Sequence, residues 1–272
     1  MARFVRLQRR KALKRLAQAA LSACATGGMT ASIAAEPAKV VLLIRELRSD
    51  NGEIVPIREE IRQLLAYFER ELRIRFEIRR YPWARLLNNA KFGEGLIFGL
   101  SKTRERQMVF QYSEAIYANY VWLVTRSDTA FDFNSIEDLQ GKSVGVVRGS
   151  SYGDAFDRRR NILFHVEEDI SSHASRLKKL LNRRMDVLLF GDRRTQAEEV
   201  DRYLHQIFAE EFGKDGSNGD AGFVVLPKPL LTDELHFAGV APQFQVWLSK
   251  LDLAIQNGKK NGEIARILHI GN

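Results

Sequence analysis

Two hydrophobic periodicities alternate along this chain from residue 40 to its end, and together they restrict it to one class of fold. Apolar or alternating runs typical of β-strands begin at Val40, Ile74 and Leu96, whereas the apolar residues between Ile57 and Leu72 recur at helical spacing. The same order of strand and helix returns after Ser143. Such alternation predicts an α/β fold with largely parallel sheets.

The positive charge of the chain is concentrated at its start. The formal net charge is +8, but seven of the 42 lysines and arginines precede residue 16, and the first acid is Glu36. From Glu36 onward, 35 basic residues stand against 34 acids. The high isoelectric point therefore reflects the N-terminal segment, and no nucleic-acid partner is expected.

Residues 1–35 have the pattern of a secretory leader. The basic start is followed by an uncharged, weakly apolar run of twenty residues, Leu16 to Ala35, with small residues at its end. "RRKALK" from Arg9 resembles a twin-arginine export signal, and "LSAC", which ends at Cys24, resembles a lipoprotein cleavage box. We therefore expect a periplasmic protein, exported through a cleaved signal peptide of ordinary or twin-arginine type, or anchored by lipid at Cys24.

Cysteine and histidine usage gives no sign of a cofactor. Cys24 is the only cysteine, so the chain after the leader has neither a disulfide nor a thiolate. The five histidines show no metal-ligand spacing. We expect no cofactor and no metal.

Four segments carry a resemblance to a known family. "TRERQMVFQYSEAIY" (103–117) is similar to T-x-E-R followed by F-S-x-P-aromatic, and "SIEDLQGKSVGVVRGSS" (135–151) is similar to S-x-x-D-L-x-G-K-x-V-G-V-x-x-G-S. "LLNRRMDVLLFGD" (180–192) is similar to L-x-x-G-R-x-D-A, and the closing "LHFAG" and "NGEIARIL" complete the order. The chain from about residue 38 to residue 270 thus resembles the bacterial periplasmic solute-binding proteins of polar amino acid ABC transporters, the extracellular solute-binding protein family 3.

The resemblance implies a periplasmic binding protein-like fold, with two α/β lobes joined by a hinge and a ligand cleft between them. Residues 36–126 and 225–272 would form lobe 1, and residues 127–224 would form lobe 2. The ligand would lie near strand ends and helix N-termini, whose exposed N–H groups suit anions.

Arg106 is the first candidate for a ligand contact. It matches the family arginine that binds the carboxylate of the ligand, and a guanidinium offers two parallel donors that fit a carboxylate. The alternative is that Arg106 forms a salt bridge on the lobe surface. Arg104, two residues earlier, is expected to be solvated.

The resemblance also assigns four smaller residues to the ligand. Ser101 matches a hydroxyl that hydrogen-bonds the ligand, and Gly99 matches a position where the backbone approaches it. In "RGSS", Ser150 and Ser151 would stand at a helix N-terminus and meet the same carboxylate from lobe 2. The alternatives are a local cap for Ser101 and a plain N-cap for the two lobe 2 serines.

The remaining candidates are less like the family pattern. Trp83 either forms a wall of the cleft or belongs to the core. The family commonly places an acid for the α-ammonium five residues after the aspartate of R-x-D, but that position here is Gly191, with Asp192 one step later. Glu46 follows the first strand, where the family has aromatic residues. The ammonium partner would be Asp192 or Glu46, or the ligand has no ammonium, which is the branch that we favour.

The function implied by the resemblance is binding and not catalysis. The protein would capture a small carboxylate-bearing solute, an amino acid or a related organic acid, by hinge closure. As a monomer it would deliver the solute to the membrane permease of an ABC transporter in a transient complex. One alternative is a sensory module for a signalling partner. Another is a secreted dehydratase on the same fold, for which Glu46 and Asp192 are the candidate acids or bases.

Overall fold

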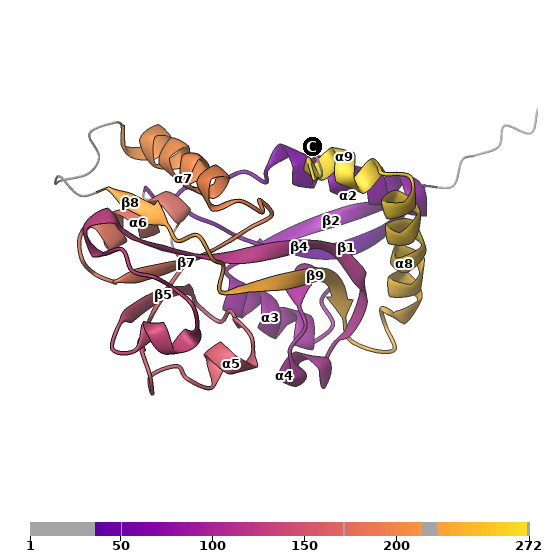
Figure 1. Cartoon of the computed structure of the whole chain (residues 1–272). Helices are drawn as coiled ribbons and strands as arrows, with labels where there is room; N and C mark the ends of the chain where they lie inside the picture. The colour runs from indigo at the N-terminus through magenta and orange to yellow at the C-terminus, as the bar shows by residue number, and fades with distance from the viewer. Residues whose placement is uncertain (1–35, 50, 171, 214–221, 271–272) are drawn as a thin grey trace, which may run out of the picture. The chain divides into compact units, whose positions relative to one another are not determined.

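The structure is a computed structural model that describes residues 36–49, 51–170, 172–213 and 222–270 (Figure 1). The predicted leader and Cys24 lie outside these residues. The strands are β1 (Ala38–Arg45), β2 (Ile74–Tyr81), β3 (Leu96–Ser101), β4 (Gln111–Arg126), β5 (Ser143–Val147), β6 (His165–Asp169), β7 (Val187–Asp192), β8 (Phe223–Val225) and β9 (Leu231–Gly239).

The helices alternate with these strands, as the periodicity predicts. They are α2 (Glu59–Leu72), α3 (Trp83–Lys91), α4 (Arg104–Gln107), α5 (Asp154–Asp157), α6 (His173–Leu181), α7 (Ala197–Phe212), α8 (Gln245–Lys260) and α9 (Glu263–Leu268). Within the described part of the chain, none of them is both long enough and apolar enough to span a membrane.

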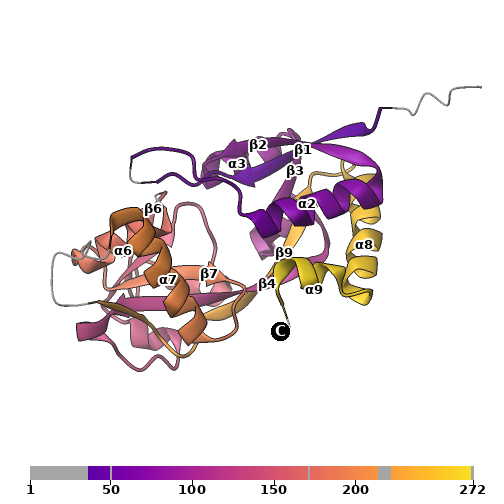
Figure 2. The same cartoon turned by 90° about the horizontal axis from the view of Figure 1, so that it is seen from above.

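The described strands form one mixed sheet in the order β2-β1-β3-β9-β4-β7-β5-β6, with β8 also paired to β4. β1 is parallel to β2 and β3, and β5 is parallel to β6 and β7, as predicted. The prediction of largely parallel sheets is wrong for β4 and β9, which pair antiparallel with each other and with their other neighbours. Both are long strands that run from one half of the sheet to the other (Figure 2).

The hydrophobic core is divided between the two halves and the two faces of the sheet. Around β1 and β3, Phe68 of α2 packs on one face, and Leu86 of α3 packs on the other. Around β5 and β7, Leu204 of α7 packs on one face, and Phe156 of α5 packs on the other. Each half of the sheet is therefore covered by helices on both faces, which is the α/β arrangement of a lobe.

Each of the two long strands, β4 and β9, contributes residues to the hydrophobic clusters of both halves of the sheet. In β4, Ile116 packs with α2, whereas Trp122 packs with α7. In β9, Leu231 packs with the α5 side of the second half, and Phe237 packs with α2. The lobe boundaries after residue 126 and before residue 225 remain a proposal, and this packing favours crossing points inside β4 and β9.

Candidate ligand-binding site

The charged turn after β3 is held by a cap at its start. The Thr103 hydroxyl accepts a 3.2 Å hydrogen bond from the backbone N–H of Arg106 and so begins the short helix α4. Arg104 projects into solvent, with a side chain 89% exposed, and forms a 3.4 Å ion pair with Asp154. Arg106 is turned the other way and is partly buried. The local helix therefore separates the two arginines.

Arg106 contacts hydroxyl and carbonyl oxygens of the chain. Its Nη1 donates to the Ser101 hydroxyl at 2.9 Å and to the Ser101 carbonyl at 3.3 Å, and its Nη2 approaches the Gly149 carbonyl at 3.5 Å. Among the residues that the structure describes, no carboxylate forms an ion pair with it. Burial lowers the pKa of Arg106, although nearby Tyr112 and Asp233 act to raise it. A partly desolvated guanidinium that forms no ion pair with the described residues is suited to bind a carboxylate.

Asp233, which the sequence analysis did not single out, lies beside Arg106. Burial raises the pKa of its carboxyl to about 6, against the opposing effects of a hydrogen bond from Ser101 and the charge of Arg106. The antiparallel register that pairs Ser101 with Leu235 brings Asp233 to this place. No local pattern in the sequence indicates that register.

The backbone conformation at residue 99 favours glycine. It lies at a β-bulge between Phe98 and Leu100 and has φ of +79°, a conformation that L side chains rarely adopt. A Cβ atom built on Gly99 would meet no described atom within 4 Å. The space beside this glycine is therefore open to a ligand.

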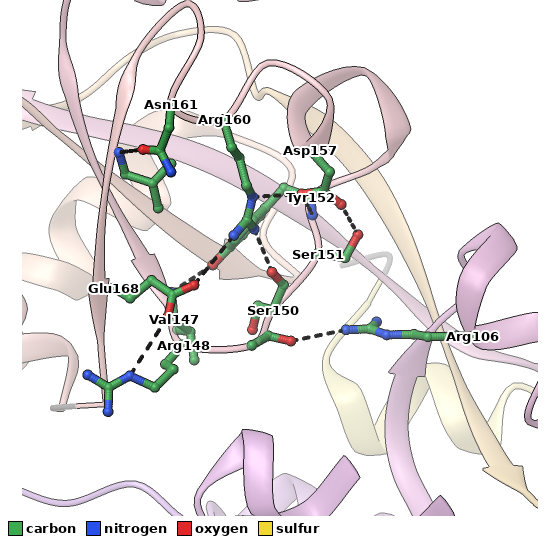
Figure 3. A network of polar contacts seen from close by, with 12 residues as sticks. Arg106, Val147, Arg148, Ser150, Ser151, Tyr152, Asp157, Arg160, Asn161 and Glu168 are labelled. Carbon is green, nitrogen blue, oxygen red and sulfur yellow. Dashed lines mark hydrogen bonds and ion pairs between the residues drawn. The ribbon is translucent and has the colours of Figure 1, made fainter. Parts of the chain in front are cut away.

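The loop at Ser150 and Ser151 is held by side chains of the following segment (Figure 3). Arg160 donates to the Ser150 carbonyl at 2.5 Å, and the Ser151 hydroxyl donates to the Asp157 carboxylate. The prediction that these serines stand at a helix N-terminus is wrong, because α5 begins at Asp154 with Gly153 as its N-cap. They instead follow the turn at Arg148 and Gly149, whose Gly149 carbonyl faces Arg106.

The two acids considered for the ammonium are already paired with arginines of the chain. Asp192 is 4% exposed and accepts hydrogen bonds from Arg194 Nη1 at 2.8 Å and from its N–H at 2.9 Å. Asp192 also lies 3.9 Å from Arg58. The Glu46 side chain, 8% exposed, accepts from Arg48 Nε at 2.7 Å.

Trp83 belongs to the core and also touches the site. It is 9% exposed and packs with Leu43 and Leu86 on the α3 face of the sheet. The guanidinium carbon of Arg106 lies 5.9 Å from the centre of its ring, within the range of a cation–π contact. The Trp83 ring therefore helps to hold the Arg106 guanidinium in place.

In the part of the chain that the structure describes, no group of histidine, cysteine and acidic side chains could hold a metal ion.

No protein-family model matches the chain. Solved structures do match it over most of its length.

An amino acid ABC transporter substrate-binding protein from Streptococcus pneumoniae, bound to L-arginine, is 18% identical with a TM-score of 0.63, covering 85% of this chain and 93% of that one. The GluR0 ligand-binding core from Nostoc punctiforme, in complex with L-glutamate, is 19% identical with a TM-score of 0.61, covering 84% and 96%. The chain has the two-lobed fold of these binding proteins.

A third similar structure bears on catalysis. It is an ancestral amino acid-binding protein, described as a precursor of cyclohexadienyl dehydratase, which is 15% identical with a TM-score of 0.61 and covers 84% of this chain and 93% of that one. At these identities the comparisons show the fold, and the fold hosts both binding and catalysis.

Proposed function

We propose that the protein is a solute-binding receptor of the polar amino acid ABC transporter type, which captures a small carboxylate-bearing solute and delivers it to a membrane permease. The observation that carries this proposal is the partly buried guanidinium of Arg106, which is hydrogen-bonded to Ser101 at 2.9 Å and lacks an ion pair among the described residues. A carboxylate would accept two parallel hydrogen bonds from it.

The two lobes would supply the two sides of the site. Ser101 and Gly99 stand at the end of β3, and the turn at Arg148 and Gly149, which precedes Ser150 and Ser151, approaches from the β5 side. Closure about β4 and β9 would tighten the contact between Arg106 and that turn. Binding of the solute would then stabilise the closed state by as much as the solute prefers it over the open one.

The pairing of Asp192 and Glu46 with arginines supports the branch in which the solute has no ammonium. A carboxylate that is already paired with a guanidinium attracts a second cation less strongly. If the ligand's ammonium displaced the arginine, the arginine would lose its ion-pair partner, which costs free energy. We therefore propose an organic acid in preference to a standard amino acid.

The test is a thermal-shift screen of the purified protein against amino acids and organic acids. A solute present at 100 times its Kd should raise the free energy of unfolding by about 2.7 kcal/mol, which gives a measurable shift. If no carboxylate shifts the transition while neutral or cationic solutes do, the proposal is wrong.

Export and partner are part of the same proposal. The mature protein should begin after Ala34 or Ala35 in the periplasmic fraction, or be attached to the membrane through Cys24, and N-terminal sequencing from the native host would decide. Full-length chain in the cytoplasm would contradict export. Genes for a permease and an ATPase beside the coding sequence would favour transport, and a neighbouring sensor kinase would favour signalling.

Catalysis is the second candidate function, and Asp233 is the residue that would act in it. A carboxyl with a pKa of about 6 beside an arginine could act as a general acid near neutral pH. If the protein converts a bound carboxylate to a new product, and Asp233→Asn stops the conversion, the protein is an enzyme. A bound acid recovered unchanged supports the receptor.

A further inference from the structure

A second group of arginines lies near the ends of β1 and β7, at the start of α2 and in α6. We call Arg45, Arg58, Arg176 and Arg193 the arginine cluster. Arg193, just after β7, donates to Glu60 of α2 at 3.2 Å and lies 5.6 Å from the ring centre of Tyr117. Arg58, which caps α2, lies 3.3 Å from Glu60.

Acidic side chains are too few to neutralise the arginine cluster. Glu60 is shared by Arg58 and Arg193, and Asp192 is shared by Arg58 and Arg194, which lies outside the cluster. Neither Arg45 nor Arg176 forms an ion pair with any residue that the structure describes. Five guanidinium groups therefore share two carboxylates as ion-pair partners, and Asp169 acts on Arg176 without forming an ion pair with it, so the excess charge calls for an anion from outside the chain.

Buried donors of the cluster also lack acceptors. Arg176 is 1% exposed, and its Nη2 donates to the carbonyls of Gly145 at 3.1 Å and Leu189 at 3.2 Å. Its Nε is buried without a partner among the described residues, and the same holds for Nε and Nη1 of Arg193. A buried charged donor costs free energy unless it is hydrogen-bonded. A ligand oxygen that accepts hydrogen bonds from these N–H groups would remove that cost.

The titration behaviour of the cluster agrees with this geometry. Burial, followed by repulsion from Arg176 and Arg58, lowers the pKa of Arg45 to about 10, although Tyr152 acts to raise it. Burial and the charges of Arg45, Arg176 and Arg58 lower the pKa of His173 well below its usual value, so this imidazole is neutral. The positive field therefore comes from arginines, which stay charged throughout the physiological pH range.

We propose that the arginine cluster is a second anion subsite, and that the solute is a dicarboxylate with one carboxylate on Arg106 and the other on Arg45 and Arg176. This inference rests on the proposed carboxylate-binding function. The sheet register brings the two positions to one place: β1 pairs parallel with β3, Leu43 opposite Ile97, so Arg45 at the end of β1 comes to the level of Gly99, two residues before the Ser101 that binds Arg106. Neighbouring strands of a sheet lie about 4.8 Å apart, so Arg45 and the serine that binds Arg106 stand on adjacent strand ends, within the reach of a small dicarboxylate.

The experiment is calorimetric titration of the purified protein with matched pairs of acids. Succinate is compared with butyrate, and glutarate with pentanoate, so that each pair differs only by a carboxylate in place of a methyl group. The dicarboxylate of at least one pair should bind about tenfold more tightly or better. Equal affinities in both pairs, or tighter binding of the monocarboxylates, would overturn the second subsite.

Arg45→Gln tests the cluster without disturbing an existing ion pair. Because Arg45 has none among the described residues and is destabilised by its neighbours, the variant should melt at the same temperature as the wild type or higher. It should lose the preference for dicarboxylates and bind monocarboxylates within about twofold of the wild type. Arg75→Gln, whose side chain is 68% exposed on β2, is the matched control and should change neither.

The two proposals fail in different ways. Suppose that monocarboxylates bind through Arg106 but Arg45→Gln leaves the ratio of dicarboxylate to monocarboxylate affinity unchanged in both pairs. The proposal of a second subsite is then wrong, and the receptor proposal stands. If neither monocarboxylates nor dicarboxylates bind, the proposed function fails and takes the second subsite with it.

Discussion

The hydroxyl of Ser101 accepts a 2.9 Å hydrogen bond from Arg106, and Ser101 also acts to lower the pKa of the nearby Asp233 carboxyl. The serine therefore orients the arginine and also interacts with an acid near it. The other guanidinium nitrogen, Nη2, has only the 3.5 Å contact with the Gly149 carbonyl, so it can turn to a carboxylate.

Replacement of Arg106 by alanine should abolish binding of a carboxylate solute, at a cost of roughly 3–5 kcal/mol if the pair is buried in the complex. The fold of the free protein should persist, because Arg106 forms no ion pair with the described residues. Arg104→Ala is the control, since that side chain is 89% exposed and should contribute little. Calorimetry of both variants with one identified solute measures the difference, and equal affinities would mean that the clamp is assigned to the wrong residue.

Asp233 should make stability depend on pH. An ordinary aspartate titrates near pH 3.9 in an unfolded chain, whereas burial raises the pKa of Asp233 to about 6 in the folded protein. Between these values the folded state retains a proton that the unfolded state has lost, so the contribution of Asp233 to the free energy of unfolding falls as the pH rises from about 4 to about 6.

The variant Asp233→Asn removes this titration. Near pH 7 it should be more stable than the wild type by about 1–3 kcal/mol, and near pH 4 the two should be alike. Urea denaturation at both pH values measures the two differences. The same stability difference at both values would show that Asp233 titrates normally.

Asp192→Asn and Glu46→Gln should separate stability from recognition. Loss of the Asp192 carboxylate leaves Arg194 without its ion-pair partner and Arg58 with Glu60 alone, and it should destabilise the protein by about 1–3 kcal/mol. Affinity for a simple carboxylic acid should change by less than about threefold in either variant. If amino acids alone bind, and one of the two variants weakens them more than tenfold, that acid holds an ammonium and the solute is an amino acid.

Gly99→Ala should cost about 1–2 kcal/mol of stability, because alanine is strained at positive φ. No steric term should be added in the free protein, since the new Cβ would meet no described atom within 4 Å. If the solute approaches the backbone here, its affinity should fall further, and titration of the variant at a temperature where it is fully folded measures this. Unchanged affinity would show that the ligand does not reach Gly99.

Local pattern was sufficient for most of the elements. The run Ser143–Val147 is a strand over its predicted length, and Pro82 precedes helix α3 as expected. The helix predicted after the glycine-serine segment begins at Asp154 and not at Ser150 or Ser151, which are held by Asp157 and Arg160 from the following segment. A local pattern cannot express a contact of that kind.

The sequence by itself determined the alternation of strands and helices, and with it the α/β class, because side-chain periodicity follows from backbone geometry alone. It also singled out Arg106, through the resemblance of "TRER" to the T-x-E-R segment of the family. Only the tertiary structure decided which acids remain available to a ligand. Asp192 and Glu46 are taken up by arginines, and Asp233 is brought to Ser101 by the register of β3 on β9. The gathering of Arg45, Arg58, Arg176 and Arg193 was decided at the same level, because their burial and shared partners depend on long-range packing that no short stretch of sequence encodes.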